Sequence, residues 1–197
     1  MYKDPPARDR INSFALVSYI PEPLAGFLDR LRQELVPNCF LRAHVTILPP
    51  RPLSSTSEAA WEIIRGIAPG FAPFEVELAG IEVFSVTDVI YLQVGAGSEE
   101  LKRMHDGFNL GGLRFQEPFP YHPHVTLAQE LRTDELDELV SVARARWAEF
   151  PHAKRFRVDK VVFVQNTRRN EWVDLGECSL GHPEARLVRE LTDLVVG

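Results

Sequence analysis

The tripeptide His-Val-Thr occurs twice in this chain of 197 residues, at 44–46 and at 124–126, 80 positions apart. Each copy lies in a segment of β-branched and apolar residues that predicts a strand. The elements expected on either side of each copy also recur in the same order. A repeat of this length constrains the fold strongly, because it predicts two similar lobes related by an approximate two-fold axis.

The elements of the first half follow from hydrophobic spacing and from breaker residues. We expect strands at 14–20, 41–48 and 74–84, and helices at 24–35 and 54–68. Pro49 and Pro50 are expected to stop the second strand, and Gly80 marks a bulge in the third.

The second half repeats this order and adds a hairpin and a tail. We expect strands at 89–94, 122–129, 156–165 and 170–178, and helices at 98–110, 133–147 and 183–196. Ser98 and Thr133 are the expected N-caps of the first two of these helices. The strand at 156–165 corresponds to 74–84 of the first half, and 170–178 is expected to pair with it as a hairpin.

Each repeat therefore predicts a small, mainly antiparallel sheet with helices on its outer face, which is an α+β arrangement. The uncovered faces of the two sheets would meet across a cleft. We expect one bilobal domain over 1–197, with lobe one at about 13–86, lobe two at about 87–181 and the helix at 183–196 as a C-terminal addition.

Charge and cysteine content exclude several classes of protein. The net charge of −6 argues against a footprint on duplex DNA, which needs many cationic contacts to phosphate. Cys39 and Cys178 lie far apart without a CxxC pair, so neither a disulfide scaffold nor a structural zinc site is expected. We see no signal peptide and no apolar run of the roughly 18 residues that span a membrane. We expect a cytoplasmic monomer without a membrane partner.

The two tripeptides present the same side chains in the same way. Strand side chains alternate between faces, so each histidine shares a face with its threonine, and the valine between them points to the other face. The valines belong to the helix-packed core, and His44, Thr46, His124 and Thr126 face the space between the lobes. If the lobes are two-fold related, these four side chains converge.

These residue types suit chemistry at phosphorus. A phosphoester needs a base for the nucleophile and an acid for the leaving oxygen, and histidine can serve as either near neutral pH. The threonine hydroxyls can donate hydrogen bonds to the non-bridging oxygens, where charge accumulates. The scheme requires no metal and no cofactor. A single HVT in a strand could arise by chance, but two copies on equivalent strands favour the functional interpretation.

The segments AHVTILPP and PHVTLAQ resemble the two signatures of the 2H phosphoesterase superfamily, the 2′-5′ RNA ligase-like and cyclic phosphodiesterase proteins. The similarity extends over nearly the whole chain in the order and spacing of elements. It implies a bilobal fold and cleavage of 2′,3′-cyclic phosphates at RNA 3′ ends or of small cyclic nucleotides. It also implies that His44 is the acid and His124 the base, and the reverse assignment stays open.

Three further side chains are candidates for substrate contact. Arg42 shares a face with His44 and could meet a phosphate, or it could be a solvent-exposed charge at a strand end. Tyr121 and Phe84 lie close to the expected cleft and could stack on a base, as aromatic side chains do with single-stranded nucleotides. Packing is the competing explanation for both.

Two alternatives remain open at this stage. His44, His124 and His122 might hold a cation, but no carboxylate lies within either motif and catalytic zinc sites have three ligands at recognisable spacing. A nucleotide- or RNA-binding module that has lost turnover would use the same cleft. Both motifs are complete in this chain, which favours an enzyme.

Overall fold

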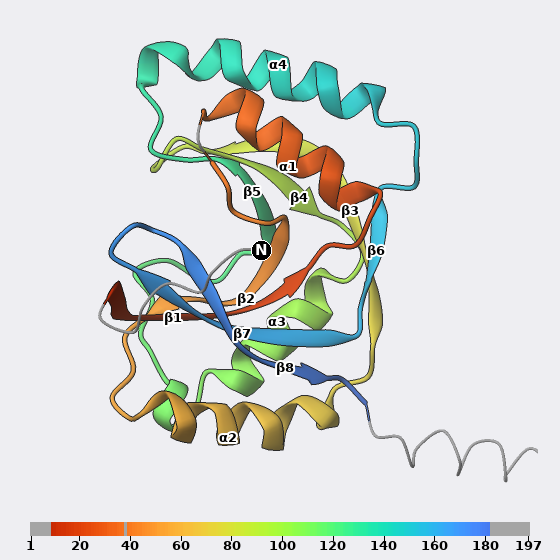
Figure 1. Ribbon diagram of the computed structural model, residues 1–197. Helices are drawn as coiled ribbons and strands as arrows, with labels where there is room; N and C mark the ends of the chain where they lie inside the picture. Colours follow the sequence, from red (N-terminus) through yellow and green to blue (C-terminus); the bar gives the residue numbers. More distant parts are fainter. Residues whose placement is uncertain (1–8, 38, 182–197) are drawn as a thin grey trace, which may run out of the picture.

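The computed structural model describes residues 9–37 and 39–181 and confirms the α+β class. Its strands form two four-stranded antiparallel sheets (Figure 1). Sheet one has the order β2-β1-β7-β8, with bounds His44–Arg51, Arg10–Tyr19, Lys160–Thr167 and Trp172–Ser179. Sheet two has the order β5-β4-β3-β6, with bounds His124–Ala128, Val89–Val94, Phe74–Phe84 and Arg155–Val158.

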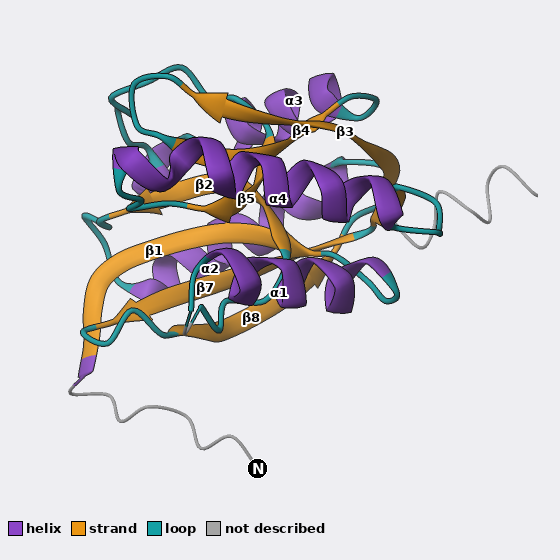
Figure 2. Ribbon diagram, turned by 90° about the horizontal axis from the view of Figure 1, so that it is seen from above, coloured by secondary structure: helices purple, strands orange, loops and turns teal. Residues whose placement is uncertain are grey.

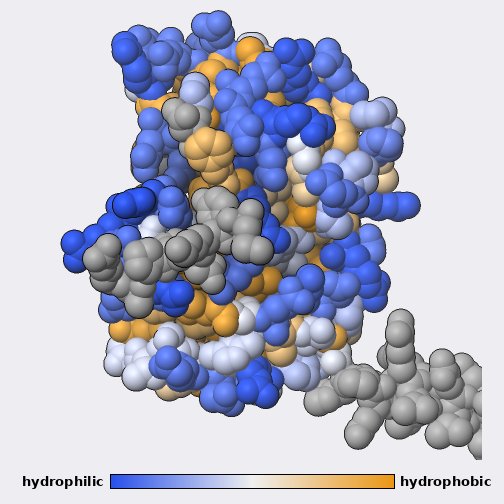
Figure 3. Space-filling model, in the orientation of Figure 1, coloured by the Kyte–Doolittle hydropathy of each residue, from blue (hydrophilic) through white to orange (hydrophobic). Residues whose placement is uncertain are grey.

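Two helices cover each sheet on its outer side. The α-helices are α1 (Leu24–Leu35), α2 (Ser57–Ile67), α3 (Ser98–Phe108) and α4 (Leu136–Glu149), with short 3-10 turns at Ala68–Gly70, Gly111–Leu113 and Thr133–Glu135. α1 packs on β5 and α4 on β3, so both cover sheet two, whereas α3 packs on β2 and α2 on β8. Figure 2 shows α1 and α4 lying side by side over the sheets. Figure 3 shows a mostly hydrophilic outer surface over α4.

The two repeats exchange elements, which the sequence did not predict. β3 closes the first repeat but pairs with β4 in sheet two, and β7 closes the second repeat but pairs with β1 in sheet one. α1 and α3 likewise each cover the sheet of the other repeat. The lobes are therefore not the contiguous segments 13–86 and 87–181.

The single strand expected at 156–165 is wrong, because the chain changes sheets within it. β6 pairs with β3, and β7 begins at Lys160 and pairs with β1. Phe156 and Val158 are buried on one side of the break, and exposed Asp159 separates them from the buried run that starts at Val161. The predicted hairpin with β8 is confirmed.

β2 does not end at its prolines but continues through Pro49 and Pro50 to Arg51. β2 is the edge strand of sheet one, and an edge strand needs only half of its backbone N–H groups for pairing. The register with β1 also shifts between Phe14 and Leu16, where the prolines lie opposite.

Both expected N-caps are wrong. Gly97 precedes α3 with φ of +88°, and a Cβ there would lie 2.6 Å from the carbonyl oxygen of Glu75, so only glycine fits. Thr133 begins a 3-10 turn, which delays the start of α4 to Leu136. The bounds of α1, β3 and β4 and the bulge beside Gly80 are as predicted.

One large apolar core joins the helices to both sheets, and a smaller cluster lies on the other face of sheet one. The smaller cluster contains Ala15, Val17, Val162 and Val164, which alternate with core residues of the same strands. In the described part of the chain, no helix has the length and apolar character needed to cross a bilayer. The helix expected at 183–196 lies outside the described residues.

Candidate active site

The two His-Val-Thr tripeptides open β2 and β5, which are edge strands of different sheets and contact each other. Val45 and Val125 are buried in the core, at 0% and 1% exposure, and the histidine and threonine on either side are half-buried. The alternation predicted from the sequence is therefore present in both strands. Because β2 and β5 contact each other, the two motifs lie side by side in the molecule.

The pairing registers fix the face on which each motif lies. On sheet one, His44 pairs with Tyr19 and Thr46 with Val17, so the motif shares the face of the smaller apolar cluster, away from the helices. On sheet two, Thr126 pairs with Tyr91 in the equivalent register. Both motifs therefore lie on sheet faces opposite the helix-packed core.

The two imidazoles are held in the same way. His44 Nδ1 lies 2.7 Å from the carbonyl oxygen of Arg42, and His124 Nδ1 lies 2.7 Å from that of His122. A carbonyl oxygen only accepts hydrogen bonds, so each Nδ1 carries the proton and donates. The neutral ring then has its lone pair on Nε2, which is the atom left to exchange protons with a ligand.

Burial keeps both imidazoles neutral near pH 7. Burial, followed by the positive charge of Arg32, lowers the pKa of His44 to about 4. Burial also lowers the pKa of His124, with a smaller contribution from His122. A proton on His124 would lower the pKa of His44 further, so protonation of one ring disfavours protonation of the other.

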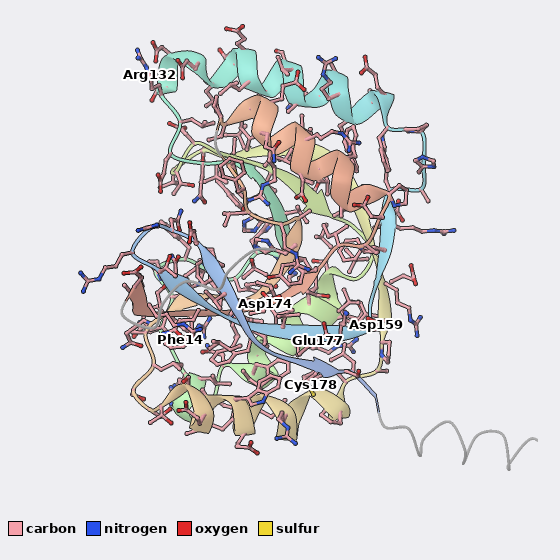
Figure 4. All side chains as sticks on the ribbon, in the orientation of Figure 1. Phe14, Arg132, Asp159, Asp174, Glu177 and Cys178 are labelled. Carbon is pink, nitrogen blue, oxygen red and sulfur yellow. The ribbon has the colours of Figure 1, made fainter. Side chains whose placement is uncertain are left out.

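The surroundings of His44 contain a side-chain cluster that the sequence analysis partly missed. Arg42 donates to Asp174 Oδ2 at 3.0 Å, and its guanidinium carbon lies 3.5 Å above the ring of Tyr19. The Tyr19 hydroxyl donates to the other oxygen of Asp174, which lies on β8 (Figure 4). The Tyr19 ring stands edge-on to His44, with 6.4 Å between centroids. Arg42 thus lies beside the motif, and its guanidinium forms an ion pair with the carboxylate of Asp174.

His124 lies against aromatic rings instead. Phe84 stacks on Tyr91 with 4.0 Å between centroids. The His124 ring is nearly perpendicular to Phe84 at 5.0 Å and lies 5.5 Å from Tyr91. His122 joins the same group, 5.4 Å from Phe84. The structure therefore places Phe84 next to the second motif.

Tyr121 connects the motifs, and its position differs from that of a base-stacking side chain. Its hydroxyl donates to the carbonyl oxygen of Thr46 at 2.6 Å, across the junction of β2 and the segment before β5. Its ring stacks on His105 of α3 at 4.2 Å and packs against the core. Both the hydroxyl and the ring are thus already engaged by the protein.

A buried polar network fixes the far end of β2. Arg51, 2% exposed, pairs with Glu117 and donates to Asn109 Oδ1 at 2.8 Å. Glu117 also lies 3.0 Å from His105 Nε2. The network anchors the segment that leads into β5. Within residues 9–37 and 39–181, no three His, Cys, Asp or Glu side chains are grouped so that they could hold a metal ion.

Residues of this site that the sequence analysis missed include Tyr19 and Tyr91, which pair with the motif strands, and Asp174, which reaches Tyr19 and Arg42 through its side chain. A fourth, Arg32, did leave a signal. It lies in the apolar stripe of α1 with Leu28, Leu31 and Leu35, and an arginine at such a position indicates a buried charge with a specific role.

The fold and the paired motifs define a class of bilobal α+β proteins in which each half contributes one strand with an imidazole and a hydroxyl. The chain belongs to the 2′-5′ RNA ligase superfamily, whose family model matches residues 20–170. This confirms the resemblance to 2H phosphoesterases that the sequence indicated.

Relatives agree with this membership, and a solved structure shares the fold. A provisionally named phosphoesterase of Halalkalibacterium halodurans is 21% identical over 175 residues, covering 87% of this chain and 99% of the relative. A provisionally named phosphoesterase of Bacillus licheniformis is 24% identical over 136 residues, covering 68% of this chain and 80% of the relative. The crystal structure of E. coli LigT complexed with 3′-AMP has a TM-score of 0.61 at 14% identity, covering 87% of this chain and all of LigT.

Proposed function

We propose that this protein is a metal-independent phosphodiesterase that hydrolyses cyclic phosphates, either the 2′,3′-cyclic phosphate at an RNA 3′ end or a small cyclic nucleotide. The observation that carries this proposal is that His44 and His124 are held in the same way. Each donates from Nδ1 to a backbone carbonyl oxygen at 2.7 Å. Two such imidazoles on adjoining strands can act as the acid and base of one reaction.

The reaction balances with these groups alone. One neutral imidazole takes a proton from water, and the water oxygen bonds to phosphorus. The bond from phosphorus to one ribose oxygen breaks, and the other imidazole, protonated at Nε2, gives its proton to that oxygen. The two imidazoles then exchange their protons with solvent before the next turnover. Thr46 and Thr126 donate hydrogen bonds to the non-bridging oxygens.

Substrate binding would prepare the acid. Both imidazoles have a lowered pKa in the free protein, and a phosphate anion between them raises the pKa of each. One ring is then protonated when substrate is present. E. coli LigT forms complexes with 3′-AMP and ATP, which supports a nucleotide substrate here. Arg42 and Phe84 are the proposed contacts to phosphate and base.

The test is hydrolysis of 2′,3′-cyclic AMP in the presence of EDTA. The unsubstituted protein is expected to turn over, and His44→Ala and His124→Ala are each expected to lose at least about 100-fold in kcat. His152→Ala, at an exposed loop position, is the matched control. Binding without turnover of any cyclic substrate would support a silent binding module instead. Activity that requires added metal would refute the mechanism.

A further inference from the structure

The two halves of the candidate site differ at the position three residues before each motif histidine. With the repeat of 80 positions, Leu41 stands in the first half where the second half has Tyr121. Tyrosine carries a hydroxyl that can donate a hydrogen bond, and leucine does not. Only the second half can therefore extend a hydrogen bond from this position to the motif of the other half.

This hydrogen bond joins the two motifs through the backbone. The Tyr121 hydroxyl donates to the carbonyl oxygen of Thr46 at 2.6 Å. β2 is an edge strand, and an edge strand has carbonyl groups that no neighbouring strand pairs. Tyr121 itself lies three residues before His124, in the segment that leads into β5. The bond therefore ties the backbone of the first motif to the chain next to the second motif.

The direction of the Tyr121 hydroxyl is fixed by the residues around its ring. The imidazole of His105 stacks on the ring, with 4.2 Å between centroids and 7° between planes. The two nitrogens of His105 lie 3.0 Å from Glu117 Oε1 and 3.1 Å from Asp106 Oδ1, so the imidazole is held at both edges. Burial, followed by the negative charge of Glu117, raises the pKa of the Tyr121 hydroxyl, which therefore stays protonated and remains a donor.

The carbonyl carbon of Thr46 is bonded directly to the Cα that carries the threonine side chain. A shift of this peptide group therefore moves the Thr46 hydroxyl as well. The hydroxyl is proposed to donate to a non-bridging phosphate oxygen, and a displacement of about 1 Å is enough to weaken such a contact strongly. Thr126 receives no equivalent bond from the first half, because Leu41 has no donor in its side chain.

We infer that Tyr121 is a positioning residue for the proposed reaction, and that it acts through Thr46 and not through Thr126. The inference rests on the proposed function and adds to it a residue that touches no reacting atom. This role differs from the base stacking expected from the sequence, because the ring already stacks on His105.

A double-mutant cycle on kcat/KM for 2′,3′-cyclic AMP tests this coupling. Thr46→Val and Thr126→Val keep the shape of the side chain and remove the hydroxyl, each at an expected cost of about 100-fold. Tyr121→Phe should cost about 10-fold in the unsubstituted protein and in Thr126→Val. In Thr46→Val it should cost under about twofold, since the hydroxyl that it positions is gone.

Trp147→Phe is the matched control for the loss of a hydrogen bond. It removes a bond of 2.7 Å from an aromatic side chain to the carbonyl oxygen of Ala79, between α4 and β3. It should leave kcat/KM unchanged, which separates a loss of stability from a loss of position. A Tyr121→Phe effect that is the same in both threonine backgrounds overturns the inference, and so does the absence of an effect in the unsubstituted protein.

Binding of 3′-AMP, measured by calorimetry, gives the same cycle without turnover. Its phosphate offers non-bridging oxygens to Thr46, so Tyr121→Phe should weaken binding by about threefold in the unsubstituted protein and in Thr126→Val, but not in Thr46→Val. If the unsubstituted protein hydrolyses no cyclic ester, the proposed function is refuted. Equal changes of Kd in the two threonine backgrounds would overturn the positioning role separately.

Discussion

Replacing His44 by asparagine tests the electrostatics of the site independently of any substrate. The imidazole has a pKa near 6.5 in an unfolded chain and about 4 in the folded protein. Between these values the unfolded chain binds a proton that the folded protein does not. Acidification from pH 7 to pH 4 therefore favours unfolding through this residue.

The size of the effect follows from the two pKa values. Each pKa unit corresponds to about 1.4 kcal/mol, so His44 should cost the protein about 3 kcal/mol of unfolding free energy between pH 7 and pH 4. Asparagine cannot titrate, and its side-chain amide can still donate to the carbonyl oxygen of Arg42 as Nδ1 does. His44→Asn should therefore lose less stability on acidification than the unsubstituted protein.

The assay is urea unfolding of both proteins across this pH range. Subtracting one curve from the other cancels the carboxylates and the net charge, which the two proteins share. His152→Asn, which removes an exposed histidine, is the matched control for the loss of one imidazole. A difference between His44→Asn and the unsubstituted protein that stays constant within about 0.5 kcal/mol would show that His44 is solvated, and the electrostatic reasoning would be wrong.

Three further substitutions test other contacts. Tyr121→Phe removes the hydrogen bond to the Thr46 carbonyl oxygen, so urea unfolding should show a loss of about 1–2 kcal/mol in the free energy of unfolding. An unchanged free energy would mean that water replaces the hydroxyl. Glu117→Gln leaves Arg51 buried without its charge partner, so thermal unfolding should show a loss of about 3–5 kcal/mol in the free energy of unfolding. The exposed control Glu149→Gln should lose under about 1 kcal/mol. Asp174→Asn frees the charge of Arg42, so KM for 2′,3′-cyclic AMP should fall by up to about fivefold; a higher KM would contradict a phosphate contact by Arg42.

Local patterns predicted most elements, because the signals for helices and strands lie within a few residues. α1, β3 and β4 have the bounds that hydrophobic spacing predicts. The exchange of β3 and β7 between sheets depends on long-range pairing, for which neither strand has a local signal. The end of β2 expected at Pro49 and Pro50 is wrong for the same reason. A proline ends a central strand but is tolerated in an edge strand, and only the topology shows that β2 lies at an edge.

The site shows a similar division. The face shared by His44 and Thr46 follows from alternation alone, and a repeat of the motif is enough to suggest a second copy of that face. The contacts of Asp174 with Arg42 depend on β8 lying three strands away from β2 in the same sheet, and no local pattern contains that information. The aromatic group around His124 likewise requires the β3–β4 register.

The exchange of α1 and α3 has a consequence for how the two repeats depend on each other. A single repeat, made as a separate polypeptide, would lack the helix that covers its motif strand and the third strand of its sheet. Neither half can therefore order its own histidine and threonine without the other half in place.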